Sequence, residues 1–392
     1  MDPEHNTPSP MNETRHPTVL QILPSLNGGG VERGTVEMAS ALKERGWTPI
    51  VASSGGLMTH ELKRIGVRHL TLPAGSKNPW VMRRNIKRLA GIIREYEVDI
   101  IHARSRAPAW SAYYAAKRTG AHFVTTFHAA YNRGGFLKNT YNAIMTKGER
   151  VIAISDFIAD HILSNYDVAP EKVVTIPRGV DCRKFNPAAI HAERIIDMAR
   201  SWGLPDGVPV IMLPGRLTRL KGHQTFIEAL ARIKDREFLA LLVGSTEGRD
   251  AYCNELNAMV KSYGLEGRVQ IKGHCDDMAV ALMLSDVVVS ATTVPEGFGR
   301  IAVEAQAMGR PVIATAHGGS METIIDGETG WLVPVGDVEA MAAALASAIG
   351  LSWEAREAVA TQAREHVKSH FDIERMCSST IALYEDILED CR

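Results

Sequence analysis

The chain has 392 residues, a length that favours two domains. Its 45% of hydrophobic and 23% of charged residues are ordinary for a soluble globular protein, and a formal net charge of -1 gives no sign of nucleic-acid binding. The charge is unevenly divided, because residues 1–180 contain 23 Lys and Arg against 15 Asp and Glu, and residues 181–392 contain 21 against 30. Two halves of opposite charge suggest two domains with different partners.

The sequence argues against a membrane span, a signal peptide, and a disulfide framework or zinc site. No apolar run approaches the roughly 18 uncharged residues of a membrane span. Residues 1–17 lack a basic region followed by an apolar one, so we predict a disordered leader and no signal peptide. Five cysteines without a CxxC pair make a disulfide framework or a zinc site unexpected, which favours a reducing compartment such as the cytoplasm.

From Thr18 onward, short β-branched runs alternate with amphipathic helical patterns. We predict strands at 18–23, 48–54, 67–72, 98–103, 122–127, 150–155 and 172–177. We predict helices at 31–46, 58–66, 80–96, 108–120 and 156–166. This βαβ alternation predicts a parallel sheet covered by helices on both faces.

A segment rich in Pro and Gly, residues 177–189, interrupts the alternation, so we place a domain boundary near residue 186. A second alternation follows it. Its strands are predicted at 208–213, 238–244, 268–273, 286–292, 311–316 and 330–335, and its helices at 222–234, 249–264 and 297–309. The last 55 residues or so are predicted to be almost all helical. We therefore predict two doubly wound domains, 18–185 and 186–371, with ligands in a cleft beyond the carboxyl ends of the strands.

The segment 295–315 carries the strongest chemical pattern. A predicted strand leads to Glu296, and Gly297 and Gly299 allow tight turns before a helix begins. Free N–H groups at a helix start bind anions, and Glu304 lies eight residues after Glu296. Two carboxylates beside a phosphate site suit sugar or ribose hydroxyls. The same spacing also fits an ordinary strand–turn–helix whose Glu residues are solvated or cap the helix.

Basic side chains mark a second strand-to-helix loop, at residues 213–230. Arg216 and Lys221 are expected at the carboxyl edge of the second sheet, where a planar and a point-like cation suit a diphosphate. Solvated loop charges are the plainer interpretation. A binding role is favoured over solvated loop charges because both residues are predicted at the same sheet edge as the helix start near Gly299.

The first half offers weaker patterns. The Gly-rich turn at 27–34 precedes the first helix, but it fails both the P-loop ending and the GxGxxG spacing. His128 follows a buried-type strand at the cleft edge, although a lone His is more often structural. Arg104 and Arg106 also end a strand there, and they are either a grip for an acidic second substrate or plain surface charges.

Taken together, the motifs resemble the family 4 retaining glycosyltransferases of the GT-B fold, over about residues 18–390. They lie at 28–33, 125–128, 151–155, 176–187, 215–222, 241–244, 296–314, 318–322 and 326–333. The Glu-x7-Glu pair of Glu296 and Glu304 is the family's most specific mark. The resemblance implies an α/β fold with two Rossmann-like domains facing a central cleft. It also implies an acceptor-side first domain, a donor-binding second domain, and a last helix, about 372–392, that crosses back onto the first domain.

The resemblance also assigns roles to individual residues. Arg216 and Lys221 would hold the donor diphosphate and stabilise the charge on the leaving group. Glu304 would bind the ribose, Glu296 the donor-sugar hydroxyls, and His128 the donor sugar near the reacting carbon. The catalytic set is thus Glu296, His128, Arg216 and Lys221. Further donor contacts are implied for Gly29, Gly30, Gly273, His274, Gly297, Phe298, Gly299 and Ile301.

The reaction implied by the resemblance moves a hexose from a nucleotide-diphosphate sugar to a glycan or lipid-linked acceptor, with retention at the anomeric carbon. Its transition state is oxocarbenium-like, and a front-side reaction is the favoured proposal. No cofactor or metal is expected, in agreement with the lack of a compelling DxD-type pair. Two alternatives stay open: a nucleotide-sugar epimerase of the same fold, and a sugar-nucleotide-binding protein without catalysis.

The acceptor is expected on the basic first half. Arg178 stands where the family often has Asn, and it is expected to tune the acceptor site together with Arg104 and Arg106. The predicted helix at 80–93 has a basic and an apolar stripe, which fits an interfacial helix as well as an ordinary surface helix; the segment 131–147 is a second candidate. We hypothesise peripheral binding to the anionic inner face of the cytoplasmic membrane and a role in lipopolysaccharide core or surface-polysaccharide assembly. No nucleic-acid partner is expected, and the oligomeric state is left open.

Overall fold

The computed structural model describes residues 15–132 and 134–390. The predicted leader therefore lies almost wholly outside the described residues, as do Arg133 of the second membrane candidate and the last two residues of the predicted terminal helix. The described chain divides into two compact units, one ending at Phe123 and the other beginning at Val124. The predicted boundary near residue 186 lies within the second unit.

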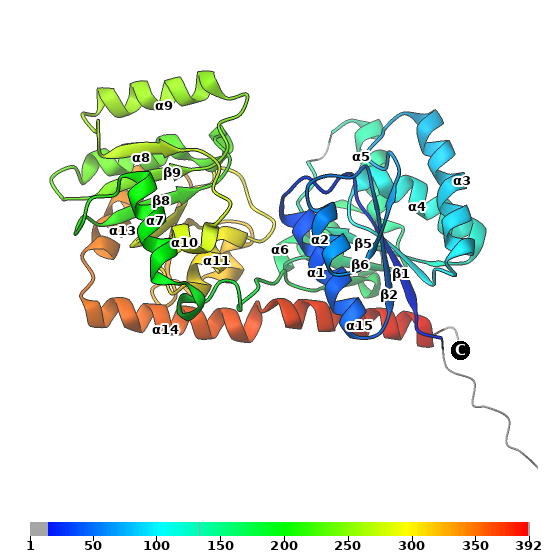
Figure 1. The fold of residues 1–392 in the computed structure, drawn as a ribbon. Helices are drawn as coiled ribbons and strands as arrows, with labels where there is room; N and C mark the ends of the chain where they lie inside the picture. The colour runs from blue at the N-terminus through cyan, green and yellow to red at the C-terminus, as the bar shows by residue number, and fades with distance from the viewer. Residues whose placement is uncertain (1–14, 133, 391–392) are drawn as a thin grey trace, which may run out of the picture. The chain divides into compact units, whose positions relative to one another are not determined.

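The first unit alternates strands and helices as the sequence predicts (Figure 1). Its strands are β1 (Thr18–Ile22), β2 (Thr48–Ser53), β3 (Arg68–Thr71) and β4 (Ile100–Ala103). Its helices are α1 (Gly30–Glu44), α2 (Thr59–Arg64), α3 (Pro79–Glu95) and α4 (Arg106–Thr119). β1 pairs in parallel with both β2 and β4, and all five of its residues are buried, as expected for a strand covered on both faces.

The second unit contains the other strands of the first sheet and the whole second sheet. Its strands are β5 (His122–Phe127, which begins just before the unit), β6 (Arg150–Ala153), β7 (Val173–Thr175), β8 (Val210–Pro214), β9 (Leu239–Val243), β10 (Val269–Lys272), β11 (Val287–Ser290), β12 (Val312–Thr315) and β13 (Trp331–Val333). Its helices are α5 (Phe136–Ala143), α6 (Asp156–Asn165), α7 (Ala192–Trp202), α8 (His223–Arg232), α9 (Asp250–Ser262), α10 (Met278–Met283), α11 (Arg300–Ala307), α12 (Ser320–Thr323), α13 (Val338–Ile349), α14 (Trp353–His370) and α15 (Ile373–Glu389).

Both sheets have the doubly wound order. In the described chain the first runs β3-β2-β1-β4-β5-β6-β7 and the second β10-β9-β8-β11-β12-β13. The order of the strands along the chain reverses between β1 and β4 in the first sheet and between β8 and β11 in the second. These reversals are the switch points beside which open α/β sheets bind ligands. The α/β prediction with two parallel sheets is confirmed.

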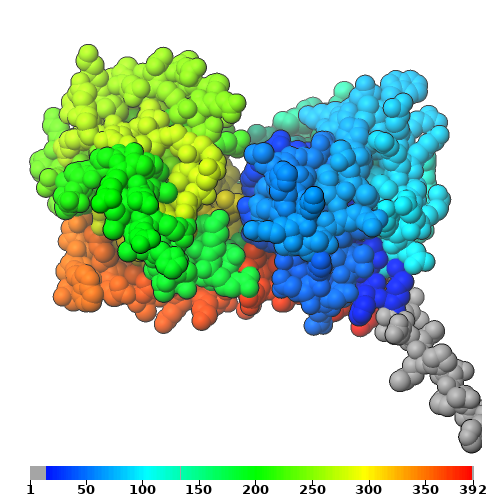
Figure 2. Space-filling view, in the orientation of Figure 1, coloured from blue at the N-terminus to red at the C-terminus, as the bar shows by residue number. Residues whose placement is uncertain are grey.

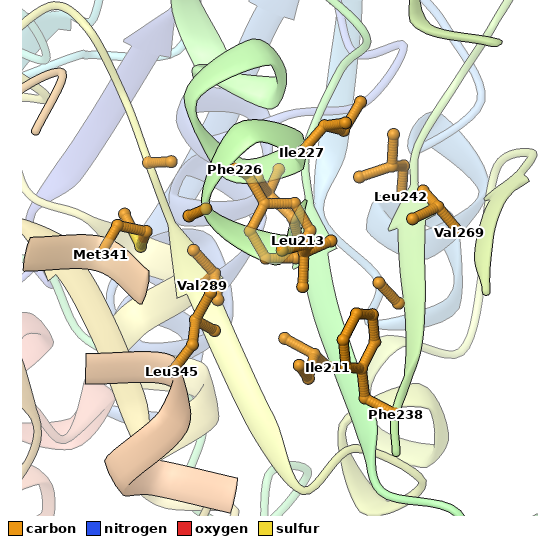
Figure 3. Close-up of a cluster of buried hydrophobic side chains, with 14 of the residues drawn as sticks. Ile211, Leu213, Phe226, Ile227, Phe238, Leu242, Val269, Val289, Met341 and Leu345 are labelled. Carbon is orange, nitrogen blue, oxygen red and sulfur yellow. The ribbon is translucent and has the colours of Figure 1, made fainter. Parts of the chain in front are cut away.

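Hydrophobic side chains from the second sheet and its covering helices form one large core (Figure 3). Ile211 and Leu213 of β8 and Val289 of β11 are fully or almost fully buried against Phe226 of α8 and Leu345 of α13. Burial of each such side chain is worth about 1.5–3 kcal/mol. This core fixes β8 and β11, and with them the loops that leave their carboxyl ends.

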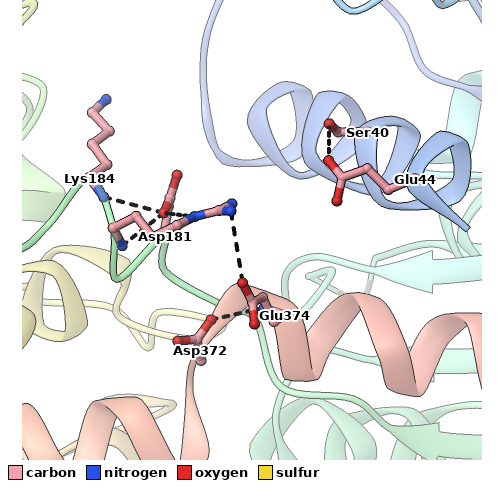
Figure 4. Close-up of polar contacts among 7 residues, drawn as sticks. Ser40, Glu44, Asp181, Lys184, Asp372 and Glu374 are labelled. Carbon is pink, nitrogen blue, oxygen red and sulfur yellow. Dashed lines mark hydrogen bonds and ion pairs between the residues drawn. The ribbon is translucent and has the colours of Figure 1, made fainter.

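The last helix begins where the chain contacts the segment after the first sheet. Val180 donates its N–H to the carbonyl of Phe371 at 2.8 Å, and its own carbonyl accepts the N–H of Ile373 at 3.0 Å. Asp372 caps the start of α15 (Figure 4). At the other end of the helix, Asp390 lies 3.4 Å from Arg150 of β6. The terminal helix is therefore joined to residues that the sequence analysis assigned to the first domain.

Candidate active site

The switch point of the second sheet is bounded by the loops after β8 and β11. The β8 loop ends in a short turn at Arg219–Lys221 and in Gly222, whose φ of +69° favours glycine. A Cβ on Gly222 would lie 1.7 Å from the carbonyl oxygen of Ala291, just after β11. Only glycine lets the two loops approach this closely, and this approach places Lys221 at the switch point.

The predicted diphosphate-binding lysine and the predicted sugar-binding carboxylate meet there. Lys221 Nζ forms an ion pair with Glu296 Oε1, and both side chains keep about a quarter of their surface exposed. The loops are also joined through their backbones, because Thr293 donates its N–H to the carbonyl of Leu220 at 2.9 Å. Arg216, on the same loop as Lys221, is exposed. The sequence thus predicted two of the charged partners that the fold brings together.

The turn after Glu296 is shaped by a left-handed glycine and anchored by a buried aromatic ring. Gly299 adopts a left-handed conformation (φ +82°) as the N-cap of α11, which the sequence predicts to begin near this residue. The Phe298 ring is buried and packs edge-on against Phe371, with ring centroids 5.5 Å apart. Its side chain therefore belongs to the core, and only its backbone N–H is left for the predicted donor contact.

Glu304 lies on α11, 4% exposed, and its Oε1 accepts from Arg300 Nε at 2.8 Å. Burial raises the pKa of this carboxyl, and the positive charges of Arg300, Lys184 and Arg178 oppose that rise. Arg178, predicted near the acceptor, is itself buried. Its charge therefore acts on the predicted ribose-binding carboxylate.

His128 follows β5 and lies beside the Glu296 turn. A Cβ on Gly297 would lie 3.0 Å from the carbonyl oxygen of His128 and 3.3 Å from Ile154 Cδ1. The structure thus brings His128 and the predicted sugar-binding turn together. Ser155 also contacts Gly297, and Glu322 contacts the next two residues, Asp156 and Phe157; both lie in motifs of the sequence but had no predicted role.

The remaining predicted donor residues lie elsewhere. Gly29 caps α1 and Gly30 begins it, at the carboxyl end of β1 in the first unit. Gly273 follows β10 and accepts the N–H of Gly244 at 3.1 Å. His274 is exposed and lies 3.1 Å from Asp276. Because β10 is the edge strand, these last residues are two strands away from β8.

Of the predicted acceptor residues in the first unit, Arg104 is 5% exposed and donates to Gln21 Oε1 at 2.9 Å. Burial lowers the pKa of His102 well below its usual value, and the positive charge of Arg104 adds to that change. Arg106 is the half-buried first residue of α4. Arg104 is thus part of the polar interior of the unit, and its contact with an acceptor stays a prediction.

In residues 15–132 and 134–390, no group of three or more His, Cys, Asp or Glu side chains could hold a metal ion. Over the same ranges, no helix is long and apolar enough to cross a membrane.

The chain is similar to several known proteins. A glycosyltransferase structure from Rickettsia africae is 40% identical, with a TM-score of 0.89, covering 95% of this chain and 99% of that chain. A Salmonella typhimurium protein, named for a glycosyltransferase role in colanic acid biosynthesis, is 30% identical over 63% of this chain and 59% of its own length. The fold also matches Anabaena HepE in complex with UDP-glucose, at 21% identity and a TM-score of 0.82, covering 95% of this chain and 100% of that one.

The two parallel sheets and these structural matches define a GT-B fold of the glycosyltransferase class. The family model described as Glycosyltransferase Family 4 matches residues 28–184, and the one described as Glycosyl transferases group 1 matches residues 195–366. The chain belongs to this glycosyltransferase family.

Proposed function

We propose that the protein is a retaining hexosyltransferase that uses a nucleotide-diphosphate sugar. The observation that carries the proposal is the pairing of Lys221 with Glu296 at the switch point of the second sheet. In the donor complex Lys221 would turn to the diphosphate, and Glu296 would accept hydrogen bonds from sugar hydroxyls. Exposed Arg216 would add a second cation, which stabilises the charge that develops on the leaving phosphate.

Several parts of the reaction are inferred from this arrangement. Glu304 would bind the ribose once Arg300 moves aside or shares it, and the N–H groups at the start of α11 would face the phosphates. Because Lys221 and Arg216 supply the positive charge, the reaction would need no metal. The leaving phosphate would help to deprotonate the acceptor on the same face of the sugar, which gives retention.

The acceptor side is a further part of the proposal. We expect a glycan or lipid-linked acceptor of lipopolysaccharide core or surface-polysaccharide assembly, on the inner face of the cytoplasmic membrane. The Salmonella typhimurium relative supports this class of acceptor through its name. Exposed Phe136 and Leu137, at the start of α5, and the exposed basic face of α3 are the described features that fit a membrane surface.

A thermal-shift screen tests the donor class. UDP-glucose, GDP-mannose and ADP-glucose are added separately, and one is expected to raise the melting temperature, because a ligand at 100 times its Kd stabilises a protein by about 2.7 kcal/mol. Lys221→Ala is expected to lose the shift, whereas Lys261→Ala, an exposed lysine on α9, is expected to keep it. No shift with any of the three sugars, or an equal shift in Lys221→Ala, would contradict the donor site.

Analysis of the reaction products separates the transferase from the epimerase and from the non-catalytic binding protein. An epimerase would convert the bound nucleotide sugar into its isomer without an acceptor, and a binding protein would give the thermal shift without turnover. Release of nucleoside diphosphate that depends on an acceptor favours the transferase.

A further inference from the structure

The first turn of α6 is capped by two side chains outside the proposed donor contacts. Glu322 accepts the N–H of Asp156 at 2.8 Å and that of Phe157 at 2.6 Å. Ser155 accepts the N–H of Ile158 at 3.2 Å. These three N–H groups have no partner within a helix, and the positive end of the helix dipole favours a carboxylate there. Ser155 and Glu322 therefore complete the start of α6.

Ser155 also contacts the Glu296 turn directly. Its hydroxyl donates to the carbonyl of Gly297 at 2.6 Å, while the same oxygen accepts from Ile158. Ser155 follows β6, and β6 pairs with β5 so that Ala153 lies opposite Phe127, the residue before His128. The Ser155 hydroxyl thus links Gly297, the residue after Glu296, to the end of β6, which lies beside the end of β5 where His128 follows.

Glu322 reaches the same turn through the backbone of its own segment. Gly318 forms an isolated parallel bridge with Glu296, and Gly319 donates its N–H to the carbonyl of Glu296 at 2.9 Å. A Cβ on Gly319 would lie 2.5 Å from Phe298 Cα, so the two stretches of backbone are in direct contact. Glu322 lies three residues after Gly319. Its hydrogen bonds to the start of α6 therefore restrain the segment 318–322, and through Gly319 they restrain the Glu296 turn.

We propose that Ser155 and Glu322 are positioning residues for Glu296. They clamp the turn between the start of α6 and the segment 318–322, so that the Glu296 carboxylate stays at the switch point beside Lys221 and at a fixed offset from His128. Neither residue touches the reacting atoms. The inference rests on the proposed function for its consequence in catalysis, because a misplacement of about 1 Å lowers a rate on the order of 10²-fold.

The matched control comes from another helix. Ser352 caps α14 by accepting the N–H of Ala355 at 3.2 Å, the same bond that Ser155 makes to α6. Ser155→Ala and Ser352→Ala therefore each remove one N-cap, but only the first removes a contact with Gly297. Ser155→Thr keeps the hydroxyl. Glu328→Ala, at an exposed position six residues after Glu322, is the control for Glu322→Ala.

Hydrogen–deuterium exchange tests the clamp without any substrate. Peptides covering 295–303 and 316–323 are expected to exchange faster in Ser155→Ala and in Glu322→Ala than in the wild type, Ser352→Ala or Glu328→Ala. Ser155→Thr is expected to restore slow exchange. Unchanged exchange in both peptides would overturn the inference, whether or not the protein is a transferase.

Turnover of whichever of UDP-glucose, GDP-mannose or ADP-glucose gives the thermal shift is the second readout. Ser155→Ala and Glu322→Ala are expected to lower kcat on the order of 10²-fold with a small change in the KM for the donor, and Ser155→Thr to recover most of it. Normal kcat in Ser155→Ala together with loss of activity in Lys221→Ala would refute the positioning role and leave the proposed function standing. Inactive wild type would count against the proposed function, and the exchange data would still decide the clamp.

Discussion

His223 begins α8, two residues after Lys221, and is fully buried. Its Nδ1 lies 3.5 Å from the hydroxyl of Tyr252, and the two rings are edge-on, with centroids 5.8 Å apart. Burial lowers the pKa of His223 to about 4; the backbone of Thr218 opposes that change, and the charge of Lys221 adds to it. The imidazole is therefore neutral at physiological pH.

The buried His223 makes the stability of the fold depend on pH. Between pH 6.5 and about 4 the unfolded chain binds a proton at this His and the folded chain does not, so stability falls as the pH falls. In urea unfolding, the wild type is expected to lose more free energy of unfolding across this window than His223→Gln, by up to about 1.4 kcal/mol per pH unit. Exposed His60→Gln is expected to parallel the wild type. Parallel curves for His223→Gln would disprove the prediction.

The site residues differ in how far sequence alone predicts them. Glu296 and Lys221 could be placed together because each follows a strand, and parallel strands end at the same edge of a sheet. Ser155 and Glu322 could not, because their hydrogen bonds span 142 and 166 residues and depend on how α6 meets the Glu296 turn. Ser155 and Glu322 lie in recognisable motifs, but the sequence does not show which residues they contact. The ion pair of Glu304 with Arg300 follows the i,i+4 spacing of a helix and was available from the sequence.

At the element scale, the predicted strands and helices are present; most are shorter than predicted, whereas α1 and α3 begin one residue earlier and α4 two residues earlier. The strand predicted at 150–155 ends at Ala153, because Ser155 becomes the N-cap of α6. The helix predicted at 297–309 begins at Arg300, because Gly299 is left-handed. Helices α7, α10 and α12 were not predicted. None of the residues of α7 is buried, so it lacks the buried apolar face by which longer helices are recognised, and α10 and α12 are only six and four residues long.

Helix α3 decides between the two interpretations of its stripes. Leu89 and Ile93 of the apolar stripe are buried, and the helix packs against α4, so this stripe serves the first unit and does not face a membrane. The four cations of the other stripe are exposed: Arg83, Arg84, Lys87 and Arg88. The helix lies at the surface of its unit (Figure 2). Apart from Trp80, which is 78% exposed near the start of the helix, α3 could contact a membrane only through these charges.

Vesicle flotation tests that contact. At low salt the protein is expected to float with vesicles that contain phosphatidylglycerol and to stay behind with phosphatidylcholine vesicles, because each cation near an anionic surface is worth about 1 kcal/mol. Binding should weaken as salt is added. Replacing the four α3 cations by Gln is expected to abolish it.

The control for flotation removes the same charge from the other half of the chain. It replaces four exposed cations by Gln: Arg200, Lys234, Lys261 and Lys368. Flotation of this variant should match the wild type. Absence of binding by the wild type at low salt would refute the membrane contact.

At the scale of the whole molecule, charge and topology suggest a division of labour. Residues 1–180 are net basic and residues 181–392 net acidic. The proposed diphosphate site nevertheless lies in the acidic half, where Lys221, Arg216 and a helix start supply positive charge locally. Under the proposed function, the general charge of that half is therefore not what binds the donor, and we expect the basic half to attract an anionic acceptor.

Sugar transfer at the Lys221–Glu296 site is measured by following a radiolabelled nucleotide sugar into product. Membranes from cells that lack the gene supply the unmodified acceptor. The wild type is expected to move label into the membrane fraction, in amounts equal to the nucleoside diphosphate released and without added metal. Lys221→Ala and Glu296→Ala should each reduce the rate roughly 10²- to 10³-fold, while Lys261→Ala transfers normally. Transfer at the wild-type rate by both site variants, or diphosphate release without label in any product, would contradict sugar transfer at this site.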